Sequence, residues 1–418
     1  MDPTSIRVLL GSSNQESYWI LESIYGIAPG NETTRSEGID IKTDSERNIY
    51  VYIGFAVNEN RAVLVKLNGN GELIWHYDIP NTSGSNFSAS TGGQFSVRSN
   101  GDIFLPVNSG IGFIRLNSSG VSQSYKFLNV PSFIESIASS LNSSNEIYVS
   151  GYNAILAKWN SSNILQWQRQ VSGTTSTERI KSIAVDVSGN VYCSALLTIG
   201  SSLRGSLIKY NNSGSLLWSR IGGSGDFFWD TATDSFGNVY TLGGGSGIGG
   251  QTLIKYDDNG VLQWQKLITN AFMQKLAVDS NDFIYAVGHY NTQNNGFICK
   301  FDSSGTLQWQ RTLDAGGTDQ VYLYGIGIDG CDSIIATGVV WRNSDVIRNA
   351  ITLKLPSDGS LTGIYGNWSY SASTLTITDS GLNLSVGSFT SGLSSYSETS
   401  SSITPGNIGS YSSSLTYI

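Results

Sequence analysis

The chain has 418 residues, of which 13% are charged, and its formal net charge is −8. It contains no cluster of Lys or Arg, which excludes the electrostatic footprint of a nucleic-acid-binding protein, and no apolar run approaches the ~20 residues of a membrane span. Gly, Ser, Thr and Asn are abundant, and this composition favours strands and turns over helices.

The N-terminal segment contains the run Tyr-Trp-Ile-Leu at positions 18–21, a strand pattern that includes Trp19. The residues before it have an early Asp and only a short apolar run, so they do not resemble a secretory signal. A ring of β-units that is closed by its N-terminal segment requires one such strand without a local partner. We therefore expect residues 1–22 to close a ring. An extra strand outside the repeats is the alternative, and residues 360–373 are the other candidate for the last outer strand.

A ten-residue hairpin pattern recurs through the chain. It consists of a strand ending in Lys, a turn rich in Asp, Asn, Ser and Gly, and a strand carrying a Trp. Copies lie at residues 66–75, 158–167, 209–218, 255–264 and 300–309, with degraded copies at 115–125 and 354–365. From Lys66 to Lys354 the spacings are 49, 43, 51, 46, 45 and 54 residues. A unit of this length is typical of an array of β-repeats.

A second strand–turn–strand pattern precedes each hairpin. Clear copies lie at residues 183–192, 232–240 and 276–285, and looser copies at 39–50, 95–104, 137–148 and 326–335. Asp and Asn side chains bond their own backbone in such turns, and Gly supplies a positive φ. Each unit therefore contains four antiparallel strands, and seven units are counted.

Seven four-stranded units predict an all-β fold: a seven-bladed β-propeller over residues 1–366, with the ring closed near the N-terminus. An open solenoid is the main competitor. The partnerless strand at the start and the lack of a polar capping repeat favour the ring. The short turns would share one face of the disc. The longer connections, from second to third strand and from fourth strand to the next blade, would share the other, which we call the loop-rich face.

Aromatic residues fall into two groups. One Trp occupies the same place in successive units and is expected to pack blade against blade: Trp19, Trp75, Trp167, Trp218, Trp264 and Trp309, with Tyr125 and Tyr365 in equivalent places. The Lys before each turn is expected to be solvated or to bond the turn. Loops on a rigid scaffold commonly carry binding residues, and the loop-rich face offers candidates for stacking on a ligand: Phe228, Trp229, Tyr290 and Trp341.

The sequence contains no recognisable catalytic or metal-binding motif. Its two histidines, His76 and His289, have no partners at metal-ligand spacing, and no nucleophile elbow or phosphate loop is present. The hairpin is similar to the Asp-box of sialidases, which is itself a turn device. Sialidase chemistry would need an arginine cluster and a Tyr/Glu pair at the disc centre, and the 11 glutamates lie outside the repeat register. We therefore expect a protein that is not an enzyme, with no cofactor and no metal.

The composition changes after Gly366. Residues 367–418 contain 17 Ser, no Lys or Arg, and apolar residues at most of the seventh positions counted from Trp368. Pro405 and the excess of Gly, Ser and Thr oppose a coiled coil. We expect an extended arm that repeats in sevens and docks either on its own propeller or on a neighbouring subunit.

The units at residues 183–192 and 207–218 resemble SBBP-type β-propeller repeats, which occur in bacterial surface proteins and in tailed-phage structural proteins. The resemblance covers residues 18–366, and Arg115 and Tyr125 depart from it. It implies a non-enzymatic virion protein, a tail or head appendage, that presents its loop-rich face to host surface glycan. The arm would anchor it to other virion proteins or neighbouring copies in a homo-oligomeric assembly. A soluble lectin-like or protein-interaction scaffold is the alternative, followed by a glycan-cleaving enzyme.

Overall fold

The computed structural model describes residues 3–13, 16–25, 35–56, 61–79, 93–106, 111–128, 136–171, 177–223, 225–245, 250–291, 295–342, 347–379, 385–386, 391–393, 398–401 and 416–417. These residues form strands and turns and contain no helix, so the all-β prediction is confirmed. No membrane-spanning helix is found in this part of the chain.

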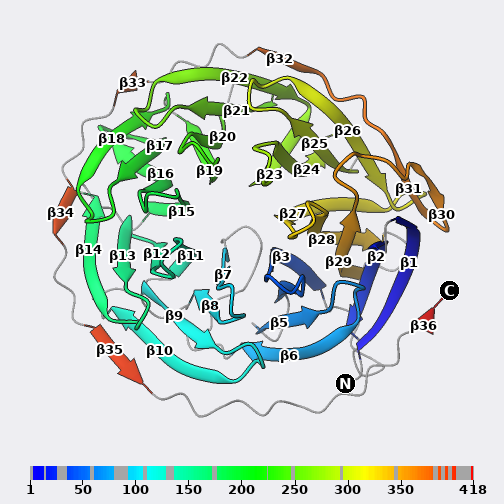
Figure 1. The fold of residues 1–418 in the computed structure, drawn as a ribbon. Helices are drawn as coiled ribbons and strands as arrows, with labels where there is room; N and C mark the ends of the chain where they lie inside the picture. The colour runs from blue at the N-terminus through cyan, green and yellow to red at the C-terminus, as the bar shows by residue number, and fades with distance from the viewer. Residues whose placement is uncertain are drawn as a thin grey trace.

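Seven antiparallel blades surround a central axis (Figure 1). From the axis outward, blade 1 consists of β3 (Arg35–Thr43), β4 (Ile49–Ala56), β5 (Arg61–Leu67) and β6 (Leu73–Ile79). Blade 2 consists of β7 (Ser96–Val97), β8 (Ile103–Pro106), β9 (Ile111–Leu116) and β10 (Ser122–Leu128). Blade 3 consists of β11 (Ser136–Leu141), β12 (Ile147–Gly151), β13 (Ile155–Trp159) and β14 (Leu165–Val171), and blade 4 consists of β15 (Arg179–Val185), β16 (Val191–Ile199), β17 (Ser202–Tyr210) and β18 (Leu216–Ile221). Blade 5 consists of β19 (Asp226–Thr233), β20 (Val239–Gly245), β21 (Gly250–Tyr256) and β22 (Leu262–Thr269). Blade 6 consists of β23 (Ala271–Val278), β24 (Ile284–Tyr290), β25 (Gly296–Phe301) and β26 (Leu307–Asp314). Blade 7 consists of β27 (Gln320–Ile328), β28 (Ile334–Arg342), β29 (Ile347–Leu355) and β2 (Glu16–Tyr25).

The N-terminal strand β2 completes blade 7. It pairs antiparallel with β29 and places Trp19 opposite Lys354, the same register that places Trp309 opposite Lys300 in blade 6. β1 (Pro3–Ser13) pairs with the outer side of β2. Blades 7 and 1 also share a buried core. Closure of the ring near the N-terminus is thereby confirmed, the open solenoid is excluded, and residues 360–373 are not the last strand of blade 7.

The hydrophobic core is divided among the blade interfaces. The buried apolar residues that the structure describes form seven clusters, and each joins two neighbouring blades. The Trp rings lie against the turn glycine of the next blade, as in the following pairs: Trp19/Gly71, Trp75/Gly120, Trp167/Gly214, Trp218/Gly260, Trp264/Gly305 and Trp309/Gly359. Trp19 thus occupies the position in blade 7 that the sequence pattern had given to Tyr365.

Five of the Lys–Trp pairs each bind one carbonyl group of the next blade. Lys209 Nζ and Trp218 Nε1 both donate to the carbonyl oxygen of Asp258, at 2.9 and 3.0 Å. The arrangement recurs for Lys66 and Trp75 with Ser118, Lys158 and Trp167 with Asn212, Lys255 and Trp264 with Ser303, and Lys300 and Trp309 with Ser357. Lys209 is only 1% exposed. The repeated Lys therefore bonds a turn, but that of the neighbouring blade, and Lys66, Lys158, Lys209 and Lys255 are buried rather than solvated.

The described parts of the C-terminal arm run around the outside of the ring (Figure 1). After β30 (Gly363–Tyr365), the arm adds one antiparallel strand to the outer edge of each of blades 6, 5, 4, 3 and 2 in turn. These strands are β31 (Trp368–Ala372), β32 (Ile377–Asp379), β33 (Ser385–Val386), β34 (Ser391–Leu393) and β35 (Glu398–Ser401). Finally, β36 (Thr416–Tyr417) pairs parallel with β1. The described strands of the arm thus pair with its own propeller.

The seven-residue repeat of the arm matches the spacing of the blades. The arm residues opposite Leu313, Ile268, Ile221, Val171 and Leu128 are Tyr370, Ile377, Ser385, Ser391 and Glu398, in steps of 7, 8, 6 and 7 residues. Trp368 and Leu375 are buried in two successive blade interfaces. Leu382, Phe389, Tyr396, Ile403 and Ser410 lie outside the described residues.

Candidate functional site

The innermost strands are irregular at one recurring place. Six of them, as far as the structure describes their pairing, shift register against the second strand by a β-bulge: Gly38/Asp40, Ser136/Ala138, Ile180/Ser182, Phe228/Thr231, Met273/Lys275 and Leu323/Gly325. A bulge inserts one extra residue and re-aims the side chains beside it. Because the innermost strands face the axis, the bulges bring successive side chains toward the centre of the ring.

A short turn follows each innermost strand. Positions counted back along the strand from the first residue of that turn define three tiers of residues around the axis. Those first residues are Asp44, Arg98, Asn142, Asp186, Asp234, Asp279 and Asp329. The floor tier, four residues earlier, is Asp40, Gln94, Ala138, Ser182, Asp230, Lys275 and Gly325. The middle tier, five residues earlier, includes Ile39, Gly93, Lys181, Trp229, Gln274 and Tyr324. The upper tier, seven residues earlier, includes Glu37, Arg179, Phe272 and Tyr322.

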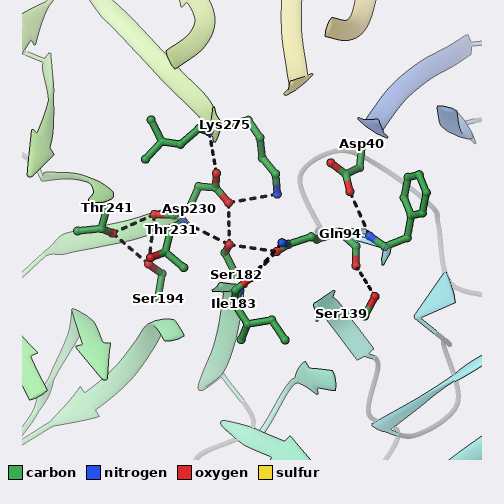
Figure 2. Close-up of polar contacts among 12 residues, drawn as sticks. Asp40, Gln94, Ser139, Ser182, Ile183, Ser194, Asp230, Thr231, Thr241 and Lys275 are labelled. Carbon is green, nitrogen blue, oxygen red and sulfur yellow. Dashed lines mark hydrogen bonds and ion pairs between the residues drawn. The ribbon is translucent and has the colours of Figure 1, made fainter. Parts of the chain in front are cut away.

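The floor tier is joined by a polar network across the axis (Figure 2). Ser182 donates its hydroxyl hydrogen to Asp230 at 2.7 Å, and the same hydroxyl lies 3.1 Å from Gln94 Oε1. Gln94 Nε2 donates to the carbonyl oxygen of Ile183 at 3.0 Å, so this side chain reaches past blade 3. Lys275 Nζ lies 3.1 Å from the Asp230 carboxylate. Side chains from four blades thus meet across the centre of the ring.

The two floor carboxylates also bind the backbone of the next blade. Asp40 accepts the N–H of Phe95 at 3.1 Å, and Asp230 accepts the N–H of Leu276 at 2.7 Å. Burial alone would lower the pKa of Lys275, but attraction by Asp230 and then Asp40 outweighs it, and the net effect raises that pKa. The floor therefore holds Lys275 in the charged state.

A cavity of about 620 Å³ lies above this floor. Its walls come from the first halves of the innermost strands, the end of β24 and the starts of β21 and β29, which are the strand ends nearest the long connections. The cavity therefore belongs to the loop-rich face. Its volume lies within the range of ~300–1,000 Å³ that small-molecule sites have.

One side of the cavity is aromatic. Trp229, Phe272, His289, Tyr322 and Tyr324 contribute rings from blades 5, 6 and 7. His289 stacks on Phe272 with ring centroids 5.5 Å apart and meets Tyr322 edge-on at 4.4 Å. Burial lowers the pKa of His289 to about 4, so its imidazole is neutral at pH 7. Burial also raises the pKa of Tyr324, so this phenol stays protonated.

Cations occupy the remaining wall. Arg348 pairs with Glu37 at 2.8 Å and lies over the ring of Trp341. Arg179 and Lys181 project from β15 two residues apart. Burial, and then repulsion from Arg179, lowers the pKa of Lys181 to about 8. The positive charges on this side of the cavity would therefore attract an anion.

The four sequence-predicted stacking residues lie in different surroundings. Trp229 lines the cavity, and Lys181 Nζ lies 5.0 Å from its ring centroid. Trp341 lies beside the cavity, under Arg348. Phe228 is 1% exposed within the core between blades 4 and 5. Tyr290 is 4% exposed, and its hydroxyl bonds those of Thr312 and Ser373. The structure thus places one of the four in the cavity wall and two in packed cores.

The other cavity residues were not singled out from the sequence, although a signal for them exists. Those on the innermost strands sit at fixed distances before the first turn residue, and most of these turns are recognisable by their Asp or Asn. At these positions the blades carry residues as different as Lys181, Trp229 and Gln274. Residues that differ within otherwise similar repeats mark the positions that are not required by the fold.

The residues of the cavity can be compared with the sets that catalysis requires. Within the described ranges, no group of three or more His, Cys, Asp or Glu side chains is placed to hold a metal ion. The cavity does bring together two arginines with Glu37 and Tyr324, part of the set that sialidase chemistry would need. However, Glu37 is already paired with Arg348, and a phenol whose pKa is raised is a poor nucleophile.

Comparisons with known proteins concern the fold. No protein-family model and no curated protein matches the chain. Among solved structures, the Dos1 propeller aligns with a TM-score of 0.50 and 9% identity, over 85% of this chain and 92% of that one. The C-terminal WD40 domain of Sif2 aligns with a TM-score of 0.47 and 10% identity, over 78% and 97% of the two chains. A protein of unknown function from Bacteroides caccae gives 0.34 and 11%, over 48% and 70%. The alignment with the Dos1 propeller supports the propeller fold of this chain.

Proposed function

We propose that this protein is a non-enzymatic binding protein that takes its ligand in the axial cavity of the loop-rich face. The observation that carries the proposal is a cavity of about 620 Å³ lined by five rings and four cations above a floor of bonded polar side chains. A concave site with aromatic walls and a few convergent polar groups is the usual form of a small-molecule site.

The biological setting we propose is a virion surface, where the cavity would recognise host surface glycan. The resemblance to SBBP-type repeats in tailed-phage proteins supports this setting. The described arm strands are bonded to the chain's own blades. We therefore assign contacts with neighbouring copies or other virion proteins to the outer rim that the arm builds, rather than to an extended tail. A soluble lectin-like scaffold would use the same cavity.

The double substitution Trp229→Ala and Trp341→Ala tests the proposal. It removes the ring in the cavity wall and the ring that supports Arg348, so adsorption to host cells, or retention of a saccharide library by the purified protein, should fall at least several-fold. Phe236→Ala is the matched control, because Phe236 is 78% exposed in the short turn between β19 and β20, on the opposite face. If the double variant binds as well as the control, the axial cavity is not the binding site.

A glycan-cleaving enzyme is the second candidate, because Arg179, Arg348, Glu37 and Tyr324 share one cavity. A turnover assay on sialylated and uronate-containing oligosaccharides distinguishes it from binding. We expect the oligosaccharides to be recovered intact. Release of product that is lost in Tyr324→Phe would replace the binding proposal with an enzymatic one.

A further inference from the structure

We propose that the ligand of the axial cavity is an acidic sugar, with its carboxylate at Arg179 and Lys181 and its ring against Trp229. This inference rests on the proposed binding function and specifies its ligand class. It follows from the charge, the exposure and the ring contacts of three side chains on the neighbouring strands β15 and β19.

Arg179 carries donor capacity that the fold does not use. Its Nε is buried and has no hydrogen-bond partner among the described residues. One Nη lies 3.4 Å from the Tyr152 hydroxyl, and the guanidinium lies over the ring of the same tyrosine at 5.5 Å. A buried N–H donor without a partner costs about 1–3 kcal/mol. Arg179 lines the cavity, and a carboxylate there would accept a charge-assisted bond from its guanidinium group.

Two of the four cations of the cavity pair closely with carboxylates of the protein. Lys275 and Arg348 are each within 3.1 Å of a carboxylate, that of Asp230 or of Glu37. Arg179 forms no ion pair with the described residues. Its neighbour Lys181 is disfavoured in the charged state by burial and by Arg179. An anion is therefore expected at this end of the cavity and not at the Lys275 or Arg348 end.

The adjoining wall fits a sugar ring. Trp229 lies beside Lys181 and tilts against Phe227 at 5.8 Å, and the amides of Gln251 and Gln274 line the same cavity. An indole buries the apolar C–H face of a pyranose while amide groups bond its hydroxyls. Asp40 and Glu37 also line the cavity and would repel a second negative charge. A singly charged carboxylate is thus favoured over a phosphate or a doubly charged ester.

Calorimetric titration with 3′-sialyllactose and lactose tests the inference, because these probes differ by one carboxylated sugar. Glucuronic acid and glucose form a second matched pair. We expect the wild-type protein to prefer the acidic member of each pair by about tenfold or more, as one charge-assisted contact supplies. Arg179→Gln and Lys181→Gln should each remove most of this preference. Lys126→Gln, on the outermost strand of blade 2, is the control and should leave it unchanged.

The outcomes separate the inference from the function on which it rests. Equal binding of the acidic and neutral members, lowered by Trp229→Ala, overturns the acidic-sugar inference and leaves the cavity as the binding site. Stronger binding of 3′-sulfolactose than of 3′-sialyllactose also overturns it. Binding of all probes that is unchanged by Trp229→Ala overturns the cavity itself. Equal thermal midpoints of the variants show that each is folded.

Discussion

The indole ring of Trp19 lies against Gly71 of blade 1, so close that a Cβ on this glycine would come within 2.8 Å of the ring. Trp19 belongs to blade 7, and the contact therefore spans the closure of the ring. The same contact joins Trp218 to Gly260 between blades 4 and 5. The seam thus has the same Trp–glycine contact as other blade interfaces, although the two residues come from opposite sides of the closure.

We predict that Gly71→Ala destabilises the propeller. Gly71 has φ +82, where an L-residue costs about 1–2 kcal/mol, and the added methyl group would also displace the Trp19 ring. Urea unfolding should show a loss of about 2 kcal/mol or more. Gly69→Ala in the same turn is the control, because its Cβ would meet only the Arg47 carbonyl at 3.5 Å. Equal stability of the two variants would contradict the proposed contact.

Trp19→Ala should open the seam. Trp19 is fully buried, and removing such a ring costs about 3–5 kcal/mol. Because β2 is attached to blade 7 by strand pairing, its amides should exchange faster with solvent once the ring is gone, beginning with Leu21 opposite Thr352. Trp218→Ala should cost a similar free energy without accelerating exchange in β2. Unchanged exchange at Leu21 in Trp19→Ala would show that the seam does not depend on this ring.

The stability of the protein should fall between pH 6.5 and pH 4 in a way that depends on His289. Burial lowers the pKa of His289 from 6.5 to about 4, so in this interval the unfolded chain binds more protons than the folded chain. The free energy of unfolding therefore decreases as the pH falls. His289→Gln should decrease less over the same interval, measured by denaturant unfolding at several pH values. His76→Gln is the control, and an identical slope in all three proteins would refute the assignment.

Lys181 should produce a second pH dependence of the stability, of the same sign, at high pH. Its pKa is lowered by burial and by Arg179 to about 8, so from pH 8 to 10.5 the unfolded chain again binds more protons. The free energy of unfolding should rise with pH in this window, and Lys181→Met should flatten the rise. The other charged or titratable groups that line the cavity are Glu37, Asp40, Arg179, Lys275, His289, Tyr322, Tyr324 and Arg348. Binding of an acidic sugar should weaken through the same window as Lys181 loses its proton.

Removal of the arm should expose the outer edges of the blades. Truncation after residue 366 deletes the strands that pair with β26, β22, β18, β14 and β10. Exposed sheet edges promote association between chains. We expect faster amide exchange in β22 and β26 and concentration-dependent aggregation in light scattering, while saccharide binding in the cavity is retained. A truncated protein that stays monomeric with unchanged exchange would show that the arm does not protect the edges.

The sequence predicted the blades more readily than the site, and the reason is physical. Every blade needs the same turn, so Asp or Asn and the glycine with positive φ recur and can be counted. The cavity positions share no residue type, because their side chains face an open space rather than a conserved neighbour. Phe228 resembled a loop residue, yet β19 begins at Asp226, so Phe228 points into the core and Trp229 toward the axis.

The arm was recognisable as extended from its composition, but its partner was not. Main-chain pairing with the outer strands involves no distinctive side chains, and only the seven-residue spacing carries information about it. Trp368 and Leu375 show the origin of that spacing, since each is buried where one blade meets the next.

The correspondence between about seven arm residues and one blade has a consequence for how such a molecule can change. A gene duplication that added a blade would leave the arm about seven residues too short to reach around the ring, and the deletion of a blade would leave it about seven residues too long. Changes in the number of blades must then be accompanied by insertions or deletions of seven residues in the arm. The length of the arm therefore follows the number of blades in the ring that it encloses.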